Sequence, residues 1–182
     1  MSKLQRGILF TALLASLVAA GLHMMALQKA GAPGRQSHAP DLYIEQPRWQ
    51  MFDKTGQLKR EMYAGRLEQW PGEARARLTK PRLQLTDGQQ QVWRARALHG
   101  WIPEDQRSVM LNEQVELRRE ASNSGLAVTT ESLRIADKGD LIETDQPVVL
   151  TSGNWHFSAT GLRAELGRQQ LELLGDVRGI HD

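Results

Sequence analysis

One pattern occurs twice in this chain of 182 residues, and it constrains the fold more than any other feature. Residues 81–88 (PRLQLTDG) lead to an alternating run at 92–98, and residues 147–153 (PVVLTSG) lead to another at 155–159. Each copy predicts a strand that starts at a proline, a turn, and a second strand. Because such a unit cannot bury its own apolar face, its recurrence predicts stacking into one extended β-structure.

Short runs in which apolar and polar residues alternate continue through residues 41–182, with turn signals between them and almost no helical periodicity. The runs at 109–111 and 115–119 are predicted as separate strands, and His99 is predicted as a turn residue. The expected fold is all-β: an antiparallel β-jellyroll, or stacked β-roll, of many short strands.

The N-terminus differs from this domain in composition. Residues 1–6 carry Lys3 and Arg6, and residues 7–28 hold no charged residue. At 1.5 Å per residue, about 20 apolar residues span a hydrocarbon core of about 30 Å. We therefore expect a cytoplasmic N-terminus at 1–6, a transmembrane helix at 7–28, and, on the far side of the membrane, a flexible tether at 29–40 and a β-domain at 41–182. A signal peptide cleaved near Ala20 is the alternative, and it exports the same domain.

The inward positions of the predicted strands are apolar and often small, and they include Trp155 and Phe157. Two interiors fit this pattern. One is a filled core, in which each large side chain contributes ~1.5–3 kcal/mol by burial. The other is an apolar groove between two separated faces, for which the low aromatic content of 5% is suitable. Composition does not separate them.

The outward positions carry arginine pairs, Arg75 with Arg77 and Arg94 with Arg96. These pairs predict a solvated outer face. The alternatives are charged guards against unwanted strand pairing and contacts with the phosphates of an anionic ligand.

The sequence shows no motif for catalysis. It has no cysteine, which excludes disulfides and thiol chemistry, and its five histidines lack the spacing of a metal site. No nucleophile motif or phosphate-binding loop is present, so we expect no catalytic residue, no metal and no cofactor. The 23 basic and 21 acidic residues are scattered and give a net charge of +2, which argues against nucleic acid as a partner.

With the apolar N-terminal segment, the tether and the repeated unit, the chain resembles the LptC family. This family is the inner-membrane-anchored periplasmic component of the lipopolysaccharide export system of Gram-negative bacteria. The matching residues are the start Met1-Ser2-Lys3, the run 53–56 with Leu58 and Ala64, 78–81 with Leu83, Trp93 with Ala95, 111–115, 129–130, 144–145 with Val148, 162–163 and 171–178.

The resemblance implies a non-catalytic β-jellyroll that takes lipopolysaccharide from an inner-membrane ABC transporter and passes it to the next periplasmic β-jellyroll of a bridge. In such a protein the acyl chains lie in the apolar interior. The corresponding lipid-lining candidates here are Leu78, Leu83, Leu85, Trp93, Leu111, Val128, Ile135, Phe157 and Leu173.

The resemblance also implies two docking edges. The edge on the transporter side is the segment 42–52, with the candidates Leu42, Ile44 and Phe52. The edge on the bridge-protein side is the segment 171–180, with the candidates Leu171, Leu173, Val177 and Ile180. Two other functions fit the sequence: an exported jelly-roll enzyme or lectin acting on envelope glycans, and a purely structural β-adaptor with a filled core.

Overall fold

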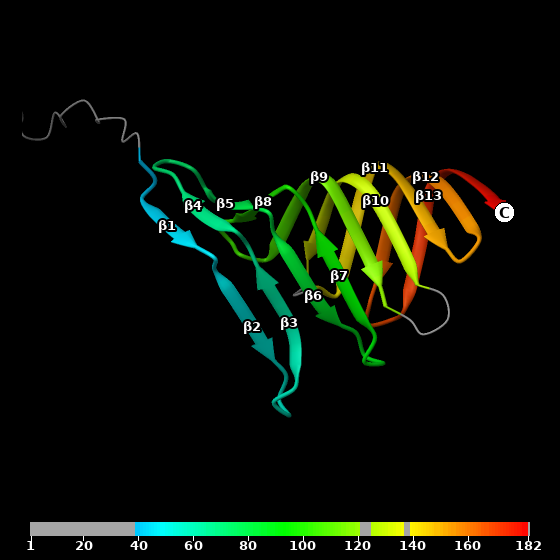
Figure 1. The fold of residues 1–182 in the computed structure, drawn as a ribbon, viewed down its shortest axis with the longest axis horizontal. Coiled ribbons are helices and arrows are strands. Elements are labelled where there is room, and N and C mark those ends of the chain that lie inside the picture. The colour runs from blue at the N-terminus through cyan, green and yellow to red at the C-terminus, as the bar shows by residue number, and fades with distance from the viewer. Residues whose placement is uncertain (1–38, 121–124, 137–138, 182) are drawn as a thin grey trace, which may run out of the picture. The chain divides into compact units, whose positions relative to one another are not determined.

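The computed structural model describes residues 39–120, 125–136 and 139–181, and every element within these ranges is a β-strand. The thirteen strands form one antiparallel sheet (Figure 1). The expectation of an all-β fold is therefore confirmed. The predicted transmembrane helix at 7–28 and most of the predicted tether at 29–40 lie outside the described residues. No helix in the part of the chain that the structure describes is long and apolar enough to cross a membrane.

The first eight strands are short, with four to six residues each. They are β1 (Leu42–Glu45), β2 (Arg48–Phe52), β3 (Leu58–Tyr63), β4 (Arg66–Gln69), β5 (Arg75–Thr79), β6 (Arg82–Thr86), β7 (Val92–Arg96) and β8 (His99–Pro103). The last five have 11 or 12 residues. They are β9 (Ser108–Arg119), β10 (Leu126–Ala136), β11 (Leu141–Ser152), β12 (Trp155–Glu165) and β13 (Gln170–His181).

The long strands change neighbours or register near their middles. The start of β9 pairs with β8, whereas its end pairs with β7, and Glu113 and Gln114 between the two parts both have positive φ, at 64° and 53°. The pairings of β10, β11, β12 and β13 also shift register along each strand. Such bulges bend a strand and increase its twist. The short strands are interrupted in a similar way. Only two residues separate β1 from β2, β5 from β6 and β7 from β8, so each of these pairs corresponds to one long strand that is broken at its middle.

Together, the bends divide the sheet into two halves. Half-sheet 1 contains β1, β4, β5, β8 and the segments 108–112, 132–136, 141–144, 162–165 and 170–173. Half-sheet 2 contains β2, β3, β6, β7 and the segments 115–119, 126–130, 147–152, 155–158 and 178–181.

Both prolines of the repeated unit lie at these bends. Pro81 follows Lys80, which has a φ of 50°, and Pro147 follows the register shift in β11. Proline has no N–H to donate and is tolerated at bulges. The carbonyl of Pro81 still accepts a hydrogen bond from the Ala97 N–H, at 3.2 Å, so pairing continues around the corner. The repeat therefore marks the line along which the sheet folds.

Turns at 53–57 and 87–91 are closed by aspartates. Asp53 accepts hydrogen bonds from the backbone N–H groups of Thr55 and Gln57 at 2.8 and 3.0 Å. Asp87 accepts from Gln89 and Gln91, both at 2.9 Å. A carboxylate that accepts hydrogen bonds from the backbone of its own turn stabilises that turn over other backbone conformations. The Asp-containing turn signals in the sequence predict these two turns.

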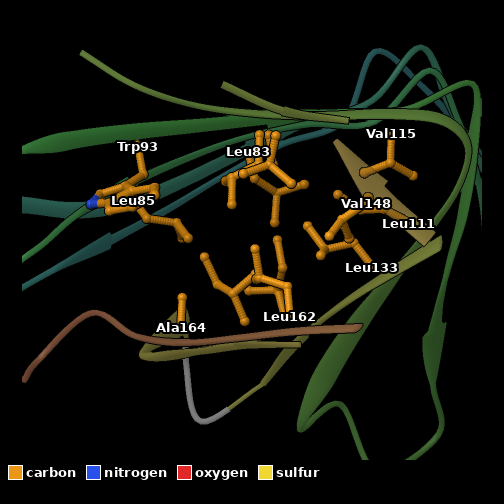
Figure 2. Close-up of a cluster of buried hydrophobic side chains, with 14 of the residues drawn as sticks. Leu83, Leu85, Trp93, Leu111, Val115, Leu133, Val148, Leu162 and Ala164 are labelled. Carbon is orange, nitrogen blue, oxygen red and sulfur yellow. The ribbon is translucent and has the colours of Figure 1, made fainter. Parts of the chain in front are cut away.

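The inner faces of the two half-sheets pack against each other. One cluster contains Leu83 and Trp93 from half-sheet 2 together with Leu162 and Ala164 from half-sheet 1. Figure 2 shows Leu83 and Leu162 pointing toward one another. Period-2 alternation places the apolar side chains of both halves on the inside, so folding the sheet along its bends buries them together.

Two expectations were wrong. The runs at 109–111 and 115–119 are parts of a single bent strand, β9, because its turn-like residues form a bulge instead of a reversal. His99 is the first residue of β8, where it pairs with Thr79 on one side and Asn112 on the other.

Candidate functional site

The predicted lipid-lining residues lie in the interior between the half-sheets, but in two groups. Leu83, Leu85, Trp93, Leu111, Val128 and Ile135 are buried members of the main cluster, and Phe157 and Leu173 pack against it. Leu78 belongs instead to a smaller cluster with Ala64 and Leu67, near the N-terminal end of the sheet.

The centre of this interior is densely packed. Leu111, Ile142 and Leu162 have no exposed surface, and Val115, Leu117 and Val128 are 1% exposed. Figure 2 shows Leu111, Val115 and Leu162 with neighbouring side chains in the space between the strands. A lipid chain could therefore enter the centre only if side chains moved or the half-sheets separated.

A pocket of about 340 Å³ lies at one rim of the interior. Its lining includes Trp93 and Leu126 from half-sheet 2 and Leu171 from half-sheet 1. The Trp93 Nε1 donates to Asp87 Oδ2 at 3.4 Å, and the Arg119 guanidinium lies 5.5 Å from the centre of the Trp93 ring. Sequence reasoning placed Trp93 in the interior but missed Arg119 and Asp87, because a strand-end arginine and a turn aspartate are routine surface residues.

The N-terminal end of the sheet exposes apolar side chains. The predicted residues Leu42, Ile44 and Phe52 are 45%, 37% and 55% exposed. Trp49 and Met51 of β2, which lie within the predicted segment 42–52, are 38% and 45% exposed. In the described residues, β1 pairs only with β4 and β2 only with β3, so each has a free edge.

The register shows which face of the sheet these residues occupy. Ile44 pairs with Leu67, and Trp49 pairs with Met62, both of which contribute to the interior clusters. Ile44 and Trp49 therefore continue the inner faces of half-sheets 1 and 2 beyond the packed centre. Tyr43 lies on the opposite face of β1, where its hydroxyl donates to Glu45 at 2.6 Å. That hydrogen bond raises the pKa of Tyr43 above its ordinary value.

The C-terminal end is the second exposed apolar edge. In the described part of the chain, β13 pairs only with β12, and Val177 and Ile180 are 51% and 69% exposed. Leu171 and Leu173, also predicted for this edge, are half-buried against the main cluster. Leu174, which lies within the predicted segment 171–180, is 58% exposed.

Aromatic rings extend the inner face at this end. Trp155 stacks on Phe157 with ring centres 5.8 Å apart and meets His181 edge-on at 4.5 Å. Phe157 also covers Gly179, where an added Cβ would lie 2.8 Å from its ring. Trp155 is 48% exposed although it has the inward phase, because it lies at the end of β12 beside the last strand of the sheet.

Within residues 39–120, 125–136 and 139–181, no group of three His, Asp or Glu side chains lies where it could hold a metal ion. The candidate site consists of the apolar interior together with the strand edges that are free at the two ends of the described sheet.

The described residues form one antiparallel sheet, folded so that two half-sheets bury apolar side chains between them, with free strand edges at both ends. The family described as lipopolysaccharide-assembly, LptC-related matches residues 12–182, and the chain belongs to this family. Membership implies a role in lipopolysaccharide transport, in which the family is a non-catalytic component. No curated protein matches the chain.

Proposed function

We propose that the chain binds lipopolysaccharide, with its acyl chains between the half-sheets, as one component of a bridge across the periplasm. It receives the lipid from the inner-membrane ABC transporter at the β1–β2 end and delivers it to a periplasmic β-protein at β13. In this proposal residues 7–28 anchor the chain in the inner membrane and the β-domain lies in the periplasm.

The observation that carries this proposal is the contrast between the centre and the ends of the interior. Leu111 is fully buried at the centre, whereas Ile44, Trp49 and Trp155 have the same inward phase and are 37% to 48% exposed. An apolar inner face that is packed at its centre and exposed at both ends suits a long apolar ligand that enters between the half-sheets from one end.

The energetics allow acyl chains to compete with the packed side chains. Moving a methylene group from water into an apolar interior is worth about 0.8 kcal/mol, so a chain of about 12 methylenes gains roughly 10 kcal/mol relative to exposure to water. That gain is comparable to the entire stability of a typical domain, at about 5–15 kcal/mol. Lipid entry can therefore offset a partial separation of the half-sheets.

The two free edges support the directional part of the proposal. An exposed edge strand presents unpaired N–H and C=O groups, and another β-protein can add a strand there. Exposed apolar residues at both ends, Phe52 on β2 and Ile180 on β13, provide side-chain contacts for two different partners.

In-cell photocrosslinking tests the interior as the lipid site. A photoreactive phenylalanine analogue at Phe157, on the inner face, is expected to crosslink to lipopolysaccharide. The matched control is the same analogue at Ser158, the next residue on the outer face of β12. Equal labelling at both positions would refute an interior site. No labelling at Phe157, with binding to a partner β-protein retained, would favour the structural adaptor.

A further inference from the structure

The outer face of half-sheet 2 carries a shallow depression of about 940 Å³ that belongs neither to the apolar interior nor to the strand edges. Five arginines and three glutamates line it, which leaves a surplus of two positive charges. We call this surface the arginine face. It is defined by Arg48, Arg82, Arg94, Arg96 and Arg118, with Glu61, Glu116 and Glu120.

The register places arginines directly opposite one another on adjacent strands. Arg82 of β6 pairs with Arg96 of β7, and Arg94 of β7 pairs with Arg118 of β9. Like charges at directly opposite positions destabilise a sheet. Two such pairs on neighbouring strands therefore require compensating negative charge, from carboxylates of the chain or from a bound anion.

The glutamates neutralise only part of this charge. Glu116 pairs with both Arg96 and Arg118, Glu120 pairs with Arg94, and Glu61 pairs with Arg48. Burial by itself would raise the pKa of Glu116, but hydrogen bonds from Arg118 and Arg96, together with their charges, hold that pKa below its ordinary value.

Arg82 stands apart from these pairs. Its side chain is exposed, and no carboxylate among the described residues forms an ion pair with it, although it lines the depression beside Arg96. Two guanidinium groups on neighbouring strands can each donate two hydrogen bonds to one phosphate or carboxylate group.

Neutral polar groups complete the lining. The Tyr63 ring and the amides of Gln46 and Gln84 lie around the arginines, and Gln84 accepts a hydrogen bond from Arg94 Nε at 3.3 Å. Phenol, amide and carboxylate groups bond sugar hydroxyls, whereas the three glutamates would repel a ligand that is anionic throughout.

We propose that the arginine face is a binding site for a phosphorylated sugar, with the phosphate between Arg82 and Arg96 and the hydroxyls on the surrounding amide and carboxylate groups. The site lies on the opposite face of the sheet from the proposed lipid site. Two sources offer this chemistry: a free sugar phosphate, and the saccharide part of a phosphorylated glycolipid.

Nuclear magnetic resonance of the full chain in neutral detergent micelles tests the site through the arginine Nε–H signals. Glucose 6-phosphate is expected to shift the signals of Arg82 and Arg96, whereas glucose should not. The double variant Arg82→Gln/Arg96→Gln should weaken binding about tenfold or more, since two charge-assisted bonds are lost. The variant Glu116→Gln should bind more tightly, by roughly threefold to tenfold, because it releases Arg96 and Arg118.

The matched control is Arg75→Gln/Arg77→Gln on the outer face of half-sheet 1, which removes the same charge and should leave binding unchanged. Equal losses in the two double variants would show attraction by net charge alone and would overturn the site. Equal affinity for inorganic phosphate and glucose 6-phosphate would overturn the assignment to a sugar.

Lipopolysaccharide binding by the same variants identifies the source. A loss in Arg82→Gln/Arg96→Gln, with Phe157 crosslinking to the lipid retained, would place the saccharide of the carried lipid on the arginine face. Unchanged lipopolysaccharide binding, with glucose 6-phosphate binding lost, would assign a free sugar phosphate. Neither result tests the proposed lipid site in the interior, which the photocrosslinks from Phe157 test separately.

Discussion

At the scale of single residues, close packing at the fold of the sheet limits what the chain tolerates. Gly100 is buried in β8, and an added Cβ would lie 2.6 Å from the carbonyl oxygen of Met110 and 3.3 Å from Cγ of Pro81. Because the first of these neighbours is backbone, the clash cannot be relieved by rotating a side chain.

We therefore expect Gly100→Ala to lower the free energy of unfolding by about 1–3 kcal/mol, the usual cost of overpacking. Gly88 is the matched control, because it is exposed and a Cβ there would meet no atom within 4 Å. Chemical denaturation of the full chain in detergent micelles gives both values. Equal stability of the two alanine variants would contradict the packing at β8.

Charge at one residue also makes stability depend on pH. The folded-state pKa of Glu116 lies below its ordinary value of 4.5, so the folded state binds this proton less readily than the unfolded state. Its contribution to stability is complete above that ordinary value and is lost as the pH falls through the folded-state pKa.

As the pH falls below about 4.5, the ordinary pKa of this group, the Glu116→Gln variant should therefore lose less stability than the parent chain. Denaturation midpoints of the parent chain and the variant at pH 7, 5, 4 and 3 measure this effect. Glu104→Gln is the control, because Glu104 is exposed and forms no ion pair among the described residues. Parallel curves for the parent chain and Glu116→Gln would show that the ion pairs with Arg96 and Arg118 contribute no pH dependence.

At the scale of strands, the two ends of the sheet differ from its middle. Inner strands such as β11 are paired on both sides, whereas β13 has one free edge among the described residues. β13 exposes the apolar Leu174, Val177 and Ile180 as well as the charged Glu172, Asp176 and Arg178. Its apolar residues provide a direct test of the proposed docking edge.

Ile180→Lys is expected to weaken binding to the proposed partner β-protein about tenfold, because it places a charge on the proposed docking edge, while leaving thermal stability nearly unchanged. Val149→Lys is the matched control: Val149 is 48% exposed but lies on the doubly paired strand β11. A pull-down titration with the partner compares them. The edge assignment fails if both lysines reduce binding equally.

At the scale of the whole domain, the half-sheets share one core and should unfold together. Leu162 of half-sheet 1 is fully buried and faces Leu83 of half-sheet 2 (Figure 2). Leu162→Ala should cost about 2–5 kcal/mol, as is usual for a large buried side chain.

Amide hydrogen exchange shows which strands become less stable in the Leu162→Ala variant. The variant should lose protection in β6 and β7 of half-sheet 2 as well as in β12, whereas Leu174→Ala, at a site that is 58% exposed, should change neither. Loss confined to half-sheet 1 would show that the halves open independently, which would make separation for lipid entry less costly.

The sequence by itself determined the class of fold and the side of each strand that is buried. Alternation at Leu83, Leu85 and Leu111 predicted the inner face, because a side-chain period of two follows from strand geometry alone. The turns at Asp53 and Asp87 were also predictable, because a carboxylate bonds the backbone of its own turn.

Only the tertiary structure decided how these strands connect and which charges meet. A bulge such as that at Glu113 and Gln114 resembles a turn in sequence, and whether it reverses or bends the chain depends on the neighbouring strands. Likewise, the opposition of Arg82 to Arg96 follows from register between residues 14 positions apart, which no local pattern specifies.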